Sequence, residues 1–167
     1  MSKPILNLDE LDFFDFGNGE GFACRMGMIS RRIGGEQLGY NLTIVPPGKK
    51  AFPFHSHRHN EEMFFILEGS GEARMGDEVY PLRAGDVVAC PAGGPETAHQ
   101  FINTGDSDLK YLGVSTSKSP EVAQYPDSGK VGVVAEMPGE NEHGIPNLWR
   151  LMMRLEDTGV DYWDGED

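Results

Sequence analysis

Short stretches of alternating apolar and polar residues recur along most of the chain. In residues 22–29, Phe22, Cys24 and Met26 alternate with small or charged residues, so an extended backbone would place them on one face. Glycine or proline turns separate such stretches from one another. The pattern predicts seven to nine short strands, which is typical of a β-sandwich or barrel. The other stretches cover residues 38–45, 62–67, 71–82, 86–90, 98–103 and 109–116.

The stretch 62–67 has apolar residues on both faces of its predicted strand. Met63 and Phe65 point to one side, and Phe64 and Ile66 point to the other. A strand of this kind needs cover on both faces. We expect the outer face to be covered by a second sheet, by the C-terminal tail or by a second subunit, and we favour a homodimer.

The two ends of the chain show less alternation. Residues 1–20 indicate an irregular lead-in, and residues 117–130 indicate a loop. Residues 131–136 are a candidate for one more strand. A short amphipathic helix is a candidate for residues 147–159, because apolar residues there have helical spacing. These are Leu148, Leu151, Met152 and Leu155, with Gly159 as the stop signal.

Length and turn content favour a single all-β domain. The chain has 167 residues, which is enough for one core, and its 22 glycines and 11 prolines suit a turn-rich fold. We assign residues 1–167 to one domain, with a barrel over about 36–117 and a tail over 118–167. The two aromatic residues in the acidic C-terminal end favour docking of that end on the barrel.

Charge and cysteine content narrow the possible partners. The net charge is −13, and the absence of a basic stripe argues against nucleic acid and against anionic membrane surfaces. The N-terminus is acidic where a signal peptide would be basic. Cys24 and Cys90 fit no close-spaced metal or redox motif, so we expect free buried thiols and a cytoplasmic protein.

Three of the five histidines precede the most hydrophobic stretch of the chain. In an extended backbone His55 and His57 point to the same side, and Glu62 shares a face with Phe64 and Ile66. A carboxylate among apolar side chains is costly unless a cation neutralises it. A divalent metal held by two imidazoles and this carboxylate would do so.

A third histidine is placed to complete this ligand set. His99 follows a strand and a glycine-proline turn, which could return it to the first pair, and it shares a face with Phe101 and Asn103. Three neutral imidazoles and one carboxylate would leave a six-coordinate ion with about two positions for water or substrate. Such ligands take several metals, among them Zn, Mn, Fe and Ni.

The two segments that carry these residues resemble the two motifs of the cupin superfamily. The first runs from Gly48 to Gly69 and the second from Gly85 to Asn103. The resemblance implies a double-stranded β-helix, or jelly roll, in which His55, His57, Glu62 and His99 bind one divalent metal. Both motifs depart from the family spacing, and the second has a longer turn before His99.

The wider pattern is similar to a bacterial cupin subgroup labelled as sugar phosphate isomerases. The shared features are the segment from Tyr125 to Lys130 and the acidic-aromatic end. The resemblance implies an enzyme that acts on a small sugar or sugar phosphate. Two alternatives stay open, because a fold does not determine a reaction: an Fe(II)-type dioxygenase and a non-catalytic module that binds a small ligand.

Several charged residues near the motifs are candidates for further roles. His59 and Glu96 are candidates for the catalytic base, because they lie in turns next to the ligands in sequence. Lys49, Lys50 and Arg58 are candidates for binding a phosphate or carboxylate of the substrate. Solvent-exposed turn residues without a role remain the alternative for all five.

Overall fold

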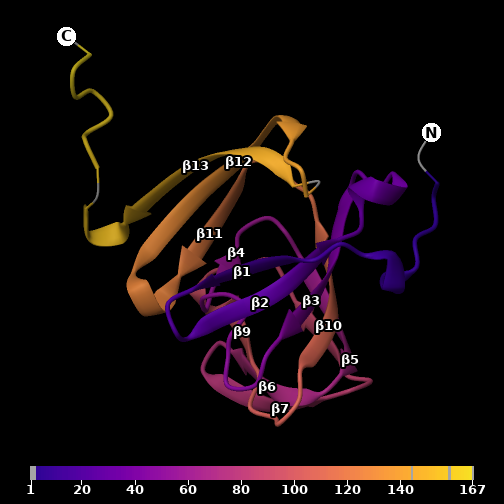
Figure 1. The fold of residues 1–167 in the computed structure, drawn as a ribbon. Helices are drawn as coiled ribbons and strands as arrows, with labels where there is room; N and C mark the ends of the chain where they lie inside the picture. Colours follow the sequence, from indigo (N-terminus) through magenta and orange to yellow (C-terminus); the bar gives the residue numbers. More distant parts are fainter. Residues whose placement is uncertain (1–2, 144, 158, 167) are drawn as a thin grey trace.

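The computed structural model describes residues 3–143, 145–157 and 159–166, which fold into two packed layers of antiparallel sheet (Figure 1). This part of the chain contains thirteen strands and five short 3₁₀ helices. The helices are η1 (Leu8–Glu10), η2 (Arg31–Ile33), η3 (Pro95–Thr97), η4 (Pro126–Ser128) and η5 (Leu155–Asp157). The predicted all-β class and jelly-roll architecture are confirmed.

The first layer is one six-stranded sheet. Its strand order is β1-β2-β3-β10-β5-β8, so strands distant in sequence become neighbours. The pairing of β10 with both β3 and β5 ties the end of the predicted barrel to its start. These strands are β1 (Phe14–Asn18), β2 (Phe22–Met28), β3 (Leu38–Val45), β10 (Leu109–Thr116), β5 (Glu62–Glu68) and β8 (Val87–Cys90).

The second layer consists of two smaller sheets joined by a bridge. Their strand orders are β13-β12-β11-β4 and β7-β6-β9. Backbone hydrogen bonds in both directions between His55 and His99 connect the two sheets beside β4 and β9. These strands are β13 (Pro146–Arg154), β12 (Lys130–Glu140), β11 (Glu121–Tyr125), β4 (Ser56–His57), β7 (Glu78–Arg83), β6 (Ser70–Met75) and β9 (His99–Ile102).

The core fills the space between the layers with inward-facing residues of alternating strands. Ile66 and Leu109 are fully buried there, and Phe64 and Phe101 are nearly so. Aromatic contacts extend this core up to His99, whose ring centroid lies 5.7 Å from that of Phe64. The barrel is therefore closed by hydrophobic packing directly below the histidines.

The apolar outer face of β5 is only partly covered. The N-terminal lead-in packs Leu11 and neighbouring residues against Leu42 and Leu67. Met63 and Phe65 remain 37% and 36% exposed. The homodimer that this face suggested stays a prediction, because a single chain is described.

All seven stretches with clear alternation are strands, and two expectations for the chain ends are wrong. The segment expected to be a loop contains β11, and the lead-in contains β1. Neither strand was predicted, because neither shows a clear alternation of apolar and polar residues. Each is stabilised instead by pairing with another strand, β1 with β2 and β11 with β12.

The candidate helix in residues 147–159 is also wrong, since most of it is strand β13. Leu148 and Met152 have helical spacing, but they also fit a period of two. Antiparallel pairing with the eleven-residue strand β12 provides hydrogen-bond partners for the backbone of β13. A short isolated helix, in contrast, has only marginal stability in water. Thr158, within the same prediction, lies outside the described residues.

The C-terminal end does not dock on the barrel in the part that the structure describes. Tyr162 and Trp163 contact each other at 4.8 Å between ring centroids, and they are 84% and 71% exposed. Figure 1 shows this end leaving the body beyond η5. Asp167, the last residue of the predicted docking segment, is not described. No helix among the described residues is long and apolar enough to cross a membrane.

A buried carboxylate holds the turn that follows β4. Glu121 Oε1 accepts backbone N–H bonds from Arg58, His59 and Val122 at 2.7–3.1 Å, and Oε2 accepts one from Asn60 at 2.7 Å. Glu121 is 8% exposed. Four donors directed at one carboxylate compensate its charge and determine the path of the chain next to His57.

We expect Glu121→Gln to lower the free energy of unfolding by about 2–3 kcal/mol. The amide loses the charge and turns an NH₂ group toward backbone N–H donors, which leaves buried groups without partners. Denaturant unfolding of this variant and of Glu78→Gln, an exposed acid on β7, measures the effect. A difference of less than about 0.5 kcal/mol between the two variants would show that Glu121 does not hold the turn.

Candidate metal centre

The backbone brings the four predicted ligands to one end of the barrel. His55 and His57 flank Ser56 on β4, so the two imidazoles point to the same side. Glu62 opens β5 in the first layer, and His99 opens β9 in the second. The site is therefore assembled from both layers.

Three of the four residues form a compact ligand set. Ligand-type atoms of His55, Glu62 and His99 all lie within 4.8 Å of one another. The ring centroids of His55 and His99 are 4.7 Å apart, and Glu62 Oε2 lies 3.0 Å from His99 Nε2. Within residues 3–143, 145–157 and 159–166, this is the one such group of histidine, cysteine or acidic side chains.

The fourth predicted ligand, His57, lies at the edge of this set. Its Nε2 is 3.4 Å from Glu62 Oε2, and its ring centroid is 4.9 Å from that of His55. The centroid of His99 is farther away, at 6.2 Å. His57 thus contacts the carboxylate directly, but it is not among the three residues whose ligand atoms are mutually close.

A backbone carbonyl orients the ring of His55. Its Nδ1 lies 2.8 Å from the carbonyl oxygen of Pro53, so Nδ1–H donates and Nε2 is left free to face the centre. Such a bond from the second ring nitrogen is common in histidines that bind metals, because it selects the tautomer and the ring orientation.

Electrostatics at the centre favour an ionised carboxylate and a neutral His55. Burial, followed by the nearby His99 and His57, lowers the pKa of His55 to about 4. Burial alone would raise the pKa of Glu62, but the adjacent imidazoles of His57 and His99 outweigh it and hold this pKa below its usual range. Burial likewise opposes protonation of His57, yet contact with Glu62 raises its pKa overall.

Several buried polar atoms at the centre fit a bound cation. Within the described part of the chain, Glu62 Oε2 and His99 Nε2 make no hydrogen bond of acceptable geometry, although they lie 3.0 Å apart. Both atoms are electron-pair donors, and a buried donor atom without a partner is costly. A divalent cation would satisfy them together with His55 Nε2, so the side chains present fit a Zn, Mn, Fe or Ni ion.

Aromatic rings form the floor of the centre. Phe64, Phe101 and Tyr111 pack against one another with ring centroids 4.6–5.7 Å apart. Burial raises the pKa of Tyr111, so its phenol stays protonated. This floor excludes water from one side of the ligands and leaves access only from the mouth.

Two proposed base candidates lie on turns beside the centre. The His59 side chain is 56% exposed, and its Nδ1 lies 3.7 Å from Glu121 Oε1. Glu96 Oε1 accepts the N–H of Gly94 at 2.8 Å, and backbone hydrogen bonds together with nearby Arg58 lower the pKa of its carboxyl. A carboxylate with a lowered pKa is a weak base, so this environment favours His59 over Glu96.

The predicted substrate-binding cations already have partners of their own. Lys49 Nζ donates to the carbonyl oxygen of Glu20 at 2.6 Å, and Lys50 Nζ lies 5.8 Å from the ring centroid of Phe22. The Arg58 guanidinium lies beside Gly94 and close enough to Glu96 to help lower the pKa of that carboxyl. Their role in substrate binding stays a prediction.

Tyr125 is a site residue to which sequence reasoning assigned no role. Its ring lies 6.0 Å from that of His55 with an interplanar angle of 20°, so it forms a side wall of the centre. Its position in a serine- and proline-rich stretch predicted a loop, and only the pairing of β11 with β4 brings it here. Glu121, on the same strand, was missed for the same reason.

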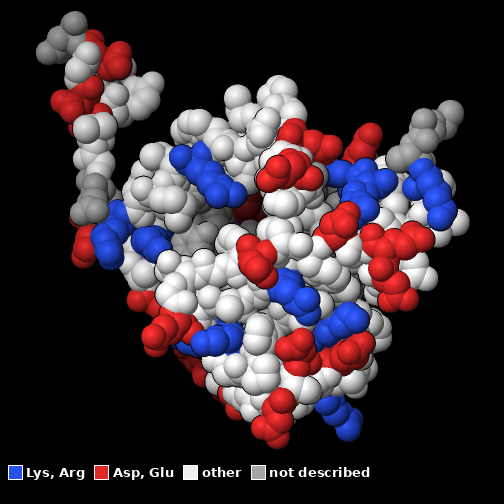
Figure 2. Space-filling model, in the orientation of Figure 1, with Lys and Arg blue, Asp and Glu red and all other residues white. Residues whose placement is uncertain are grey.

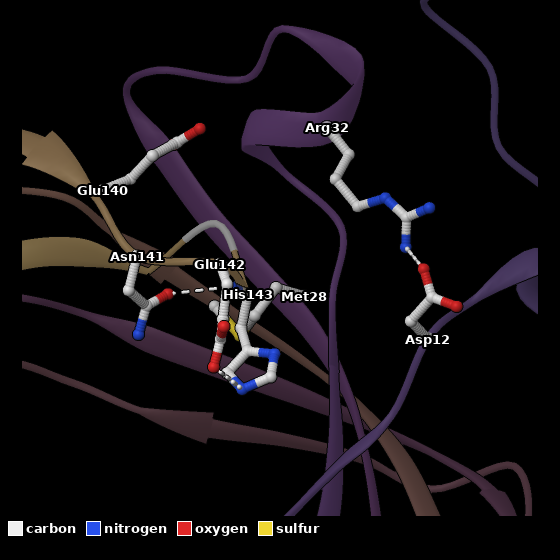
Figure 3. A pocket seen from close by; sticks show the side chains of 7 residues that line it. All are labelled: Asp12, Met28, Arg32, Glu140, Asn141, Glu142 and His143. Atoms are coloured by element: carbon white, nitrogen blue, oxygen red, sulfur yellow. Dashed lines mark hydrogen bonds and ion pairs between the residues drawn. The ribbon is translucent and has the colours of Figure 1, made fainter.

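A separate cavity lies between the lead-in and the β12–β13 turn (Figure 3). Its volume is about 280 Å³. The polar groups in it engage one another, since Arg32 pairs with Asp12 at 3.3 Å and His143 with Glu142 at 3.7 Å. This cavity does not include any of the four predicted ligands.

Comparison with known proteins finds similarity over the segment that carries this centre. Residues 41–115 match the family model described as the cupin domain. A solved structure from Silicibacter pomeroyi, titled a sugar phosphate isomerase from a cupin superfamily, superposes with a TM-score of 0.74. That match has 24% identity and covers 95% of this chain and 98% of the other, so it shows a shared fold.

Two curated relatives have different activities in their names. A 5-nitrosalicylic acid 1,2-dioxygenase of Bradyrhizobium is 33% identical over 52% of this chain and 44% of its own length. An oxalate-binding protein of Thermotoga maritima is 34% identical over 42% of this chain and 54% of its own. The chain thus spans about half the length of these relatives. The segment that carries the four predicted ligands is thus similar to the cupin domain over residues 41–115.

Proposed function

We propose that the chain is a metal-dependent isomerase or epimerase of a small hydroxy-carbonyl compound, such as a sugar or sugar phosphate. The observation that carries this proposal is the compact set of His55, Glu62 and His99, with His57 beside it, above a water-excluding aromatic floor. A structural neighbour whose title names a sugar phosphate isomerase adds support at the level of the fold.

The side chains at the centre have distinct tasks in this proposal. A bound divalent ion would supply Lewis-acid polarisation of the substrate carbonyl. His55, oriented by Pro53, and the ionised Glu62 hold that ion without a proton in competition. Phe64 and Phe101 keep water away from the reacting carbon, which strengthens electrostatic interactions at the centre.

Proton transfer is assigned to His59 in this proposal. Its imidazole is 56% exposed in the turn that follows His57, and Glu121 lies next to it. A neutral imidazole can take a proton from the carbon beside the carbonyl and return it to the neighbouring position. Glu96 remains the second candidate, with the weaker basicity noted above.

We expect the protein to bind one divalent transition metal ion per chain. Glu62→Gln keeps the side-chain shape but removes the charge, and His57→Ala removes one imidazole. Each should weaken metal affinity by at least about a hundredfold, because even outer-shell changes cost 10–100-fold. Titration of metal-free protein with Zn²⁺, followed by calorimetry, measures both.

A matched control for the metal experiment is His143→Ala. His143 stacks on Phe14 at 4.6 Å, in the separate cavity, and should leave stoichiometry and affinity unchanged. Full retention of affinity in Glu62→Gln and His57→Ala would contradict the ligand assignment. Circular dichroism of each variant checks that a loss of affinity does not reflect unfolding.

The dioxygenase alternative has a specific observation in its favour. A relative named as a dioxygenase matches about half of the chain, and imidazole-carboxylate sets also suit Fe(II) chemistry. A non-catalytic binding module is the third candidate, because another relative is named as an oxalate-binding protein. Neither alternative requires His59.

Turnover without oxygen separates the three candidates. We expect the metal-loaded protein to interconvert a hydroxy-ketone and its aldehyde isomer equally fast in air and under argon. His59→Gln should reduce kcat by about 10²–10⁴-fold, which is the usual contribution of a general base. Oxygen consumption coupled to product would instead support the dioxygenase, and tight ligand retention without product would support the binding module.

A further inference from the structure

The inner face of the sheet β13-β12-β11-β4 continues from the metal centre to a group of cations. His57 lies opposite Ala123, Ala123 opposite Gly132, and Gly132 opposite Met152. Directly opposed residues share a face of a sheet. The next row on this face joins Tyr125, Lys130 and Arg154.

Two contacts connect Lys130 to a metal-ligand histidine. The Lys130 ammonium lies 5.4 Å from the ring centroid of Tyr125, and that ring stacks on His55 at 6.0 Å. The ammonium is therefore held at the side wall of the centre rather than on a distant surface.

Arg150 lies on the same face, one row away from Met152. It is opposite Val134, which is in turn opposite Glu121. The Met152 thioether lies over Gly132, where a Cβ atom would be only 2.6 Å from its sulfur, and next to the ring of Tyr125.

The carboxylates on this face do not neutralise these cations. Glu121 is occupied by four backbone N–H donors, and Glu136 pairs with Arg31 at 2.8 Å. Across the described ranges, Lys130, Arg150 and Arg154 have no carboxylate within 4.0 Å. Arg154 instead donates to the carbonyl oxygen of Ser128 at 3.1 Å.

Unpaired cations on one face are notable in a chain with a net charge of −13. Figure 2 shows this side of the molecule hollowed below the β12–β13 hairpin, with basic side chains on the hairpin side of the hollow. The charges and the opening therefore occur on the same side of the molecule.

We propose that Arg150 and Lys130, flanked by Tyr125 and Met152, form the substrate-binding wall of the metal centre and select compounds that carry an oxyanion group, either a phosphate or a carboxylate. This inference rests on the proposed function, in which a small hydroxy-carbonyl compound binds at the metal. It assigns substrate charge recognition to the β12–β13 hairpin, and not to the lysines that adjoin the first motif in sequence.

The chemistry of the wall explains why an anion is favoured over a neutral sugar. The Arg150 guanidinium offers a planar fork that suits two oxygens of one oxyanion, and the Lys130 ammonium adds a point charge. The apolar faces of Tyr125 and Met152 displace water and strengthen both interactions.

A matched set of three-carbon compounds tests the wall. Dihydroxyacetone is neutral, dihydroxyacetone phosphate adds a phosphate, and hydroxypyruvate replaces one hydroxymethyl group by a carboxylate. We expect the Zn²⁺-loaded protein to bind one or both charged compounds at least about tenfold more tightly than dihydroxyacetone in calorimetry at low salt. The compound with the larger advantage identifies the oxyanion.

Variants attribute this advantage to individual side chains. Arg150→Gln and Lys130→Gln should each reduce the affinity for the charged compound about tenfold, with no change for dihydroxyacetone. Arg150→Lys should fall between them and the wild type, because it keeps the charge and loses the fork. Arg83→Gln, an exposed arginine on β7, is the matched control and should behave like the wild type.

The outcomes for the wall and for the isomerase are independent. Equal affinity for all three compounds, or an anion advantage that survives Arg150→Gln and Lys130→Gln, would overturn the wall. Arg150-dependent binding without any interconversion would refute the isomerase and retain the wall. Thermal unfolding of each variant confirms that these exposed or half-exposed substitutions leave the fold intact.

Discussion

The structure depends on the burial of one carboxylate among imidazoles and aromatic rings. Glu62 opens a strand whose next inward residues are Phe64 and Ile66, so its charge lies at the top of a hydrophobic core. An isolated charge there would cost several kcal/mol. The fold brings His57 and His99 against Glu62 from the opposite layer, so a cation bound between these side chains would meet this cost. The antiparallel bridge between His55 and His99 is the backbone feature that makes this convergence possible.

A second buried carboxylate, Glu121, meets the same cost in another way. Backbone N–H groups bond to both of its oxygens, three to Oε1 and one to Oε2, so this carboxylate is already engaged by the backbone. Glu62, in contrast, has an oxygen without a hydrogen bond among the described residues, beside nitrogen atoms in the same situation. The hydrogen bonds to the oxygens therefore distinguish Glu121, which supports a turn, from Glu62, which is available for a cation.

Much of the barrel and the ligand set could be predicted from sequence, because both depend on local patterns. A period of two located the core strands, and the spacing around His55, Glu62 and His99 predicted residues that the fold brings together. The wall could not be predicted. Tyr125 and Arg150 lie in segments whose patterns favoured a loop and a helix, and only long-range pairing makes them neighbours of the centre. The apolar residues of β13 have helical spacing by coincidence, because both faces of this strand carry apolar side chains.

The same distinction applies to the two groups of cations considered for substrate binding. Lys49 and Lys50 adjoin the first motif, but their ammonium groups turn to Glu20 and Phe22. Lys130 is far from that motif in sequence and yet lies against the ring that stacks on His55. Ligands of a metal must contact one ion, which constrains their spacing along paired strands, whereas a substrate can bridge any two elements that face the same hollow. In the proposed function, the barrel would therefore hold the cation, and the hairpin that follows the barrel would select the substrates that reach it.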